Sequence, residues 1–300
     1  MSCSTSDVMP EAALAPRVPP PVSPRRTTGR LELVFAPDAQ GRSFLSRQFA
    51  SYPFHVCRVQ YLDPDLPDMA SLYLQSSAGG LFAGDVLGVS ITCKPGAMAH
   101  VTTQASTIAY RMPNGEACQR TDLEVGENGF LEYVPDPVIL FPQARLKNRL
   151  KLNLASNATA IVVDAFLSHD PGGAHRPFGH YSSETEITDA AGRRLMLDRF
   201  HISGMARSAG NVGIMGAYGM QATILAASTA VTPQSLLSAF REGLADMPSV
   251  YAAASTLPND CGAWVRLLAD DGAVLRHAVA KLWMGLRWGI TGRAPAPRRK

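Results

Sequence analysis

The stretch Leu146-Lys147-Asn148-Arg149-Leu150-Lys151-Leu152-Asn153-Leu154 decides the fold class of this 300-residue chain. Its leucines fall on even-numbered positions, and its basic residues fall on the odd-numbered positions between them. Successive side chains of a β-strand point to opposite faces of a sheet. A strand therefore buries the leucines and leaves the basic groups in water, whereas a helix could not separate them at this spacing.

The same kind of pattern recurs along the chain. It predicts strands at 31–35 and 86–93, with further strands at 119–125, 130–134, 158–166, 184–188 and 194–202. Turn-forming residues separate them, and residues 126–129 and 189–192 are predicted to be hairpin connections. Short strands with turns between them favour a mainly β protein of stacked or sandwiched sheets. The lack of a fixed sequence period argues against a solenoid or a propeller.

Two helices are predicted in the C-terminal third. The first begins with Thr232 as N-cap and Pro233 as its first residue, carries apolar residues at helical spacing, and ends near Met247-Pro248. The second spans 273–290, with an apolar face that leaves Lys281 and Arg287 on other faces. Its residues Trp283, Leu286 and Trp288 fit two interpretations, docking of a partner or packing onto the sheet.

Composition limits the classes of partner and compartment. Residues 1–28 are rich in Pro and Ser and are expected to be a disordered, dispensable tail; 29–290 are expected to form a single β domain, and 291–300 a basic flexible tail. The N-terminus lacks the pattern of a signal peptide, and no apolar stretch is long enough to span a membrane. Five widely spaced cysteines indicate reduced thiols in the cytoplasm. A net charge of +3, without a basic cluster, indicates no nucleic-acid partner.

Known catalytic motifs are missing from the sequence. It contains no nucleophile elbow, P-loop, HExxH or kinase motif, so no catalytic residue is predicted and the chain is not expected to be an enzyme. One cluster has the chemistry of a metal site: His169, Asp170, His175 and His180 share a loop rich in Pro and Gly, and imidazole suits nickel and zinc. The alternative is an exposed loop whose histidines never converge.

Four segments, in order, resemble one protein family. Gly79-Gly80-Leu81-Phe82-Ala83-Gly84-Asp85 is similar to the GGLxxGD signature of the D-type (or H-type) urease accessory proteins. Residues 95–107 resemble the PGA and TTQAxTK stretch of that family, Tyr110-Arg111 its YR pair, and 131–142 its LExxPxPxIxFxxA block. Around 164–180 the chain departs from the family pattern, with Ser168-His169 in place of a GR pair.

The resemblance implies a mainly β scaffold with an internal passage for an ion. Such a scaffold binds apo-urease and the F-type accessory protein, and through the latter it recruits the G-type GTPase that delivers Ni²⁺ to urease. Glycine at 79, 80 and 84 would supply positive-φ or side-chain-free positions. Asp85 would then begin the next strand with its carboxylate at the sheet edge. The other motif positions expected to be structural are Thr103, Gln104, Tyr110, Arg111 and Pro142.

A nickel route needs ligands that release what they bind, and oxygen ligands hold late transition metals less tightly than sulfur does. The predicted route therefore runs through Asp85, Glu132 and Asp164, with His169 and His175 as additional positions. No tightly bound cofactor is expected, only transient Ni²⁺. Two alternatives stay open at this point, a stand-alone nickel- or zinc-binding protein that uses the His169–His180 loop, and an enzyme with an unrecognised site on a β-sandwich.

Overall fold

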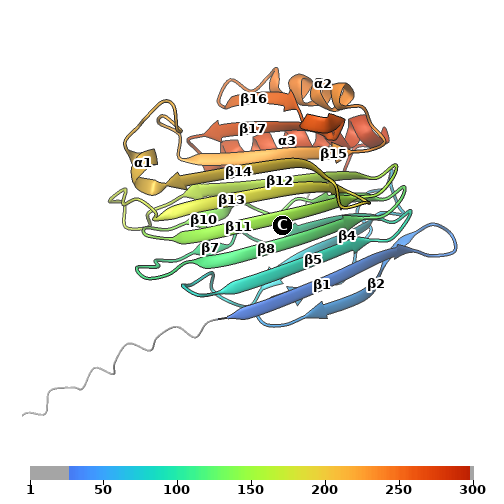
Figure 1. Ribbon diagram of the computed structural model, residues 1–300, viewed down its shortest axis with the longest axis horizontal. Coiled ribbons are helices and arrows are strands. Elements are labelled where there is room, and N and C mark those ends of the chain that lie inside the picture. The colour runs from blue at the N-terminus through green and yellow to red at the C-terminus, as the bar shows by residue number, and fades with distance from the viewer. Residues whose placement is uncertain (1–26, 298–300) are drawn as a thin grey trace, which may run out of the picture.

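The computed structural model describes residues 27–297, in which two stacked β-sheets carry a pair of helices at one side (Figure 1). The first sheet has seven strands, in the order β14-β13-β11-β8-β5-β1-β2. Their bounds are β1 Thr28–Pro37, β2 Ser43–Ala50, β5 Val86–Cys93, β8 Ala117–Val125, β11 Arg145–Leu154, β13 His180–Asp189 and β14 Arg194–Ser203. The quoted leucine stretch forms β11, with its leucines buried and its lysines exposed, as predicted.

The second sheet has ten strands, with the main order β16-β17-β15-β12-β9-β6-β4-β3 and with β10 between β12 and β7. Their bounds are β3 Phe54–Val56, β4 Ala70–Ser76, β6 Met98–Thr103, β7 Ile108–Ala109, β9 Phe130–Tyr133, β10 Val138–Leu140, β12 Thr159–Ser168, β15 Met220–Ser228, β16 Tyr251–Thr256 and β17 Gly262–Ala269. The predicted fold class, mainly β with stacked sheets, is confirmed.

The chain alternates between the two sheets from β4 to β13. Strands β4, β6, β9 and β12 are parallel neighbours in the second sheet, and β5, β8, β11 and β13, which come between or after them in sequence, are parallel neighbours in the first. This region is therefore wound as a flattened coil. The sequence, which has no fixed repeat, did not predict this winding. Backbone ladders hold such a coil together, and they require no repeated sequence.

Residues 126–129 do not form the predicted hairpin, because β8 and β9 lie in different sheets. They make a corner of the coil, and this corner stacks on the preceding one through the bonds from Gly126 N–H to Cys93 O and from Gly96 N–H to Glu127 O. A Cβ at Gly126 would lie 2.7 Å from the backbone nitrogen of Pro95, so glycine is needed for the stacking. The second predicted hairpin, at 189–192, does connect the antiparallel strands β13 and β14.

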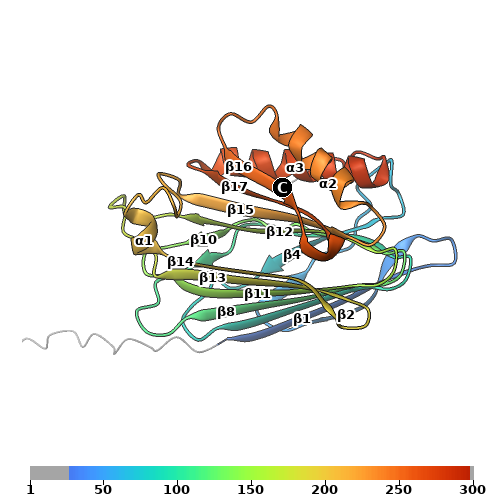
Figure 2. The same cartoon turned by 45° about the horizontal axis from the view of Figure 1, so that its top comes forward.

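Helices α2 (Pro233–Leu244) and α3 (Gly272–Thr291) cover part of the outer face of the second sheet (Figure 2). Both were predicted, although α2 ends before Met247. Two short helical segments, α1 (Gly204–Ser208) and a 3₁₀ turn at Pro258–Asp260, were not. On α3, Trp283 and Leu286 pack in the core, whereas Trp288 is 61% exposed. No helix within 27–297 is long and apolar enough to cross a membrane.

The predicted N-terminal tail lies mostly outside the described residues, whereas 291–297 of the predicted C-terminal tail are described. Of the predicted N-terminal tail, only Thr27 and Thr28 are described, and Thr28 already begins β1. At the other end, Thr291 still belongs to α3, and the Ala296 N–H donates to Asp63 Oδ1 at 2.6 Å. The boundaries predicted at 28 and 291 therefore each lie slightly inside a regular element.

Candidate functional site

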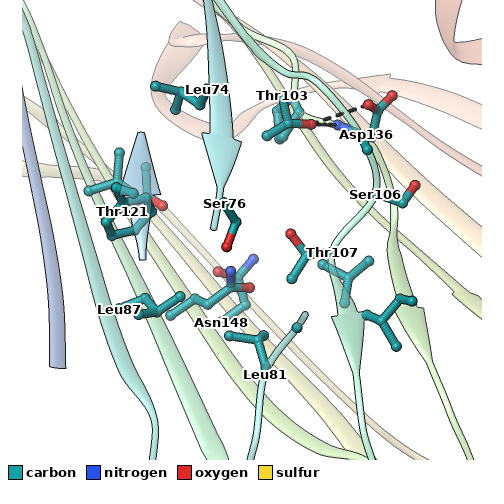
Figure 3. Close-up of a pocket in the computed structure, with 18 of the residues that line it drawn as sticks. Leu74, Ser76, Leu81, Leu87, Thr103, Ser106, Thr107, Thr121, Asp136 and Asn148 are labelled. Atoms are coloured by element: carbon teal, nitrogen blue, oxygen red, sulfur yellow. Dashed lines mark hydrogen bonds between the residues drawn. The ribbon is translucent and has the colours of Figure 1, made fainter. Parts of the chain in front are cut away.

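A cavity of about 430 Å³ lies between the two sheets, and Figure 3 shows side chains of its wall. Strands of both sheets and the 103–107 loop form it. Its oxygen-bearing side chains include hydroxyls, amides and two carboxylates, from Ser76, Thr103, Gln104, Ser106, Thr107, Gln119, Thr121, Asp136, Asn148 and Asp164. Within the described part of the chain, no His or Cys lines it. Arg120 is the basic residue among the described lining residues, and its side chain is exposed. The oxygen donors of the wall suit a hydrated or weakly held cation.

The glycine-rich loop 79–85 forms one part of this wall. Gly80 has φ of +151°, and a Cβ there would lie 2.3 Å from the carbonyl oxygen of Ile108, so any side chain would clash. Gly84 also has a positive φ, of +87°, whereas the space around Gly79 is open. The predicted role of the glycines therefore holds at 80 and 84, and nothing in the structure requires glycine at 79.

Asp85 directly precedes β5, and its carboxylate is buried there. Its Oδ2 accepts the N–H of Phe82 at 2.9 Å, which closes the glycine turn. Its Oδ1 accepts the N–H of Thr27 at 2.8 Å, which ties the loop to the start of β1. Both carboxylate oxygens thus satisfy backbone donors, and the side chain has a clear role in shaping the loop.

Thr103 connects the neighbouring loop to the segment after β9. Its hydroxyl accepts the N–H of Asp136 at 2.8 Å, and Thr103 and Asp136 both line the cavity (Figure 3). Gln104 lies beside it on the wall with an exposed side chain. These motif residues therefore shape the same cavity as the glycine loop.

Asp164 belongs to β12 and reaches across the cavity wall to the opposite sheet. Its Oδ1 accepts the Tyr181 hydroxyl at 2.6 Å and the Asn148 amide at 3.1 Å. Its Oδ2 accepts the Ser183 hydroxyl at 2.6 Å. Burial and the neighbouring Asp164 charge raise the pKa of Tyr181 well above its usual value, so the phenol keeps its proton and donates. Among the described residues no basic group pairs with Asp164, so its partners are neutral donors.

Glu132, on the neighbouring strand β9, is fully buried on the other side of the sheet. Its Oε1 accepts Arg287 Nε at 2.5 Å, its Oε2 accepts Arg287 Nη2, and His100 Nδ1 lies 2.7 Å from Oε2. Arg287 Nη1 also donates to Asp63 at 2.6 Å. Burial alone would raise the pKa of Glu132, but the hydrogen bonds and charges of Arg287 and His100 outweigh it and lower the pKa to about 2. Arg287 is itself fully buried, contrary to its predicted place away from the apolar face.

The four candidate metal ligands of the 169–180 loop have separate surroundings. His169 lies against Phe141, with ring centroids 5.8 Å apart, and Asp170 is paired with Arg176 at 2.6 Å. His175 is exposed with φ of +53°, and His180 Nε2 lies 3.1 Å from Glu116. Hydrogen bonds from the Arg176 side chain lower the pKa of Asp170. Across residues 27–297, no three His, Cys, Asp or Glu side chains are grouped so as to hold a metal ion.

The remaining motif residues lie at the end of the sandwich next to the glycine loop. Tyr110 packs over Gly80, where a Cβ would meet its ring, and stacks on Phe82 at 5.0 Å. Arg111 Nε donates to Gln143 Oε1 at 2.6 Å. Pro142 occupies the turn closed by the bond from Ala144 N–H to Phe141 O.

Comparison with known proteins decides the family. A family model described as UreD urease accessory protein matches residues 27–300. The chain belongs to the UreD family. It is 36% identical over 277 residues to urease accessory protein UreD 1 of Pseudomonas syringae pv. syringae, which covers 92% of this chain and 97% of that relative. It is 37% identical over 296 residues to UreD 1 of Methylorubrum extorquens, with 98% of each chain covered.

More distant UreD proteins also match along nearly their whole length. UreD 2 of Streptomyces griseus is 30% identical over 291 residues, covering 95% of this chain and 98% of the relative. The resemblance read from the sequence motifs is therefore confirmed. Because UreD proteins are named as accessory proteins of urease, their family is consistent with a non-catalytic role for this chain.

Several residues that shape the site were not singled out from the sequence. Asn148 had a visible signal, because it is the polar residue at an inward-facing position of the leucine stretch. No sequence signal marked Tyr181, Ser183 or Asp63, since their roles depend on which strands and loops the fold brings together. Arg287 could have been found from its position four residues after Trp283, on the buried side of α3.

Proposed function

We propose that this UreD-family chain is a scaffold for urease maturation that binds apo-urease and the F-type accessory protein. Through the F-type protein it recruits the G-type GTPase, and it passes Ni²⁺ toward the urease active site. Nickel is its cargo, held transiently, and the chain acts in the cytoplasm, where free thiols such as Cys93 and Cys261 suit a reducing compartment. Family membership supports the accessory role in general, and the finer steps are our proposal.

The observation that carries the nickel step is the position of Asp164 on the wall of the cavity. Hydroxyl and amide groups donate hydrogen bonds to its carboxylate, and within the described residues no cationic side chain pairs with it. A cation that enters the cavity would therefore meet an uncompensated negative charge in surroundings less polar than water, where attraction is stronger. The rest of the wall offers hydroxyl and amide oxygens. Such ligands exchange quickly enough for an ion to move on.

The other residues of the predicted route are either buried and hydrogen-bonded within the protein or exposed at its surface. Asp85 and Glu132 both accept hydrogen bonds from groups of the protein itself. We assign them structural roles, Asp85 in the glycine loop and Glu132 in the contact between the sheet and α3. His169 and His175 are exposed in the loop after β12, where an ion could be met outside the cavity. Asp164 is thus the residue on which we base the proposed route.

The test is reconstitution of urease activation from purified apo-urease, the F-type protein, the G-type GTPase, GTP and Ni²⁺, with and without this chain. Thr107 lines the cavity, so Thr107→Trp should fill part of it and block passage. Gln48→Trp adds the same bulk on the exposed strand β2 and serves as the control. We expect activation to require the chain, to fall sharply with Thr107→Trp, and to be normal with Gln48→Trp.

Complex assembly is measured in the same samples by size-exclusion chromatography. Full activation by Thr107→Trp within an intact complex would reject the cavity as the route. Activation that proceeds equally well without the chain would reject the scaffold role altogether.

A further inference from the structure

Four chain segments end side by side next to the glycine loop. Leu81 bridges Ala109 in parallel register, Ala109 pairs with Leu140, and Leu140 pairs with Ser168. The next residue in each segment donates its N–H onward, as in the bonds from Tyr110 to Leu81 O, Phe141 to Ala109 O and His169 to Leu140 O. The backbone ladder therefore places four consecutive ring-bearing residues in one row: Phe82, Tyr110, Phe141 and His169.

The rings of this row, called here the aromatic ladder, touch in sequence. Phe82 and Tyr110 stack with centroids 5.0 Å apart at 6°, Tyr110 meets Phe141 edge-on at 5.5 Å, and Phe141 lies 5.8 Å from His169. Cross-strand aromatic pairs of this kind stabilise a sheet, which explains the contacts among the rings. It does not explain why the row is left at the surface, with Phe82 38% exposed and His169 also exposed.

A cationic group stands beside the ladder. Arg111 follows Tyr110, and its Nε is fixed by the Gln143 side chain at 2.6 Å. Gln143 adopts φ of +60°, a conformation that is strained for a residue other than glycine. Within the described residues, no carboxylate pairs with Arg111. The ladder thus combines aromatic surface with a positioned, unneutralised guanidinium.

We propose that the aromatic ladder and Arg111 bind a carboxylate-bearing segment of a protein partner. Aromatic and Arg side chains are enriched among residues that dominate protein–protein affinity. Covering the ladder with an uncharged segment would leave the guanidinium desolvated and unpaired, which is costly, whereas a carboxylate would bind it in a bidentate manner. Charge complementarity therefore selects an acidic segment over an apolar or basic one.

The position of the ladder links it to the cavity. Leu81, Ile108 and Val138, each within a few residues of a ladder ring, line the cavity wall. A partner held on the ladder would therefore lie beside the cavity. This inference rests on the proposed scaffold function, and it adds the surface and the chemistry by which a partner would be recognised there.

The experiment measures the affinity of the full chain for purified apo-urease and, separately, for the purified F-type protein. Variants are Tyr110→Ala, Phe82→Ala, Arg111→Glu and Arg111→Lys. For one of the two partners we expect Tyr110→Ala and Arg111→Glu each to raise Kd by about 30-fold or more, the effect of losing a residue that dominates binding. Arg111→Lys should retain much of the affinity, and higher salt should weaken wild-type binding.

Two control variants have the same chemistry elsewhere on the surface. Phe49→Ala removes an aromatic ring that is 46% exposed on β2, and Arg193→Glu reverses a charge at the β13–β14 turn. Both should leave Kd unchanged. If Tyr110→Ala lowers thermal stability, the affinities of Phe82→Ala and Arg111→Glu, which change exposed side chains, test whether the ladder binds a partner.

The outcomes distinguish failure of the aromatic ladder as a binding surface from failure of the proposed scaffold function. If wild type binds a partner and the ladder variants bind within about threefold of it, the ladder is only sheet packing and the inference is overturned. If wild type binds neither partner, the proposed scaffold function fails, and this inference with it.

Discussion

Glu132 and Asp164 are acidic residues on adjacent parallel strands of one sheet, yet they have opposite surroundings. The register pairs Glu132 of β9 with Ile161 of β12, and both side chains face the helical layer. Asp164 comes three residues after Ile161, so the two-residue period of a strand turns it to the other face, toward the cavity between the sheets. Sequence reading placed both on one ion route, but the sheet separates them.

The difference between the two regions lies in what balances the charge. Under α3 the protein supplies its own cation, since Arg287 joins Glu132, Asp63 and, through Asp63, the backbone of Ala296. Beside the cavity, the donors to Asp164 within the described residues are hydroxyl and amide groups, and none of them is a cation. A closed ion network fixes structure, whereas a carboxylate without a counter-ion can attract a mobile cation.

The largest effect is expected from Arg287→Met. Removing the guanidinium leaves two buried carboxylates uncompensated, and breaking a buried ion pair in this way costs about 3–5 kcal/mol. Urea unfolding at neutral pH measures the change. The control is Arg199→Met, which removes an arginine from the exposed pair with Glu184 and should cost no more than about 1 kcal/mol. Equal costs for the two variants would show that the buried network has no special role.

The second largest effect is expected in the pH dependence of the free energy of unfolding. The pKa of Glu132 is about 2 in the folded chain, against 4.5 for the free side chain. A depressed folded-state pKa stabilises the protein above the unfolded value, and this contribution is lost as pH falls from about 4.5 toward 2. It amounts to about 3 kcal/mol at most. His100, Arg287 and Asp63 also face this group.

Unfolding free energies measured from neutral pH down to about pH 3 check this expectation. Glu132→Gln cannot titrate, so its stability should fall less steeply with acid than that of wild type. Parallel curves for the two proteins would contradict the assignment of the acid-sensitive step to Glu132.

A smaller effect is expected on the cavity side. Tyr181→Phe removes one of the donors to Asp164, while Asn148 and Ser183 keep theirs, so stability should fall by about 1 kcal/mol. Thermal unfolding measures this change. A loss of stability as large as that caused by Arg287→Met would mean that the hydrogen bonds to Asp164 stabilise the fold as strongly as the Glu132 network does. The contrast between the two regions would then be contradicted.

Local pattern predicted much of the fold. The alternation in β11, the N-cap of α2 and the apolar face of α3 were all visible in sequence, since each depends on neighbours a few residues apart. Strand β16, with the sequence Tyr-Ala-Ala-Ala-Ser-Thr, has no clear alternation and was missed. The corner at 126–129 was misread because the same turn residues serve a hairpin and a crossing between sheets.

The site was less predictable than the fold. Family motifs singled out the glycine loop and Thr103, which the structure places at the cavity. They could not show that Asp85 caps a turn or that Glu132 meets Arg287, 155 residues away in sequence. The aromatic ladder depends on the register of four separate segments, which no local pattern encodes. Long-range pairing therefore set the limit of sequence reasoning here.

The most direct test of the account is urease activation by Asp164→Asn. The substitution keeps the size of the side chain and an oxygen that can accept hydrogen bonds, but it removes the charge that faces the cavity. Asp122→Asn removes the same charge from the exposed outer face of β8 and is the matched control. We predict that Asp164→Asn assembles normally with apo-urease and the F-type protein yet delivers less nickel and activates urease poorly, whereas Asp122→Asn behaves as wild type. Normal nickel content and full activation with Asp164→Asn would contradict the account.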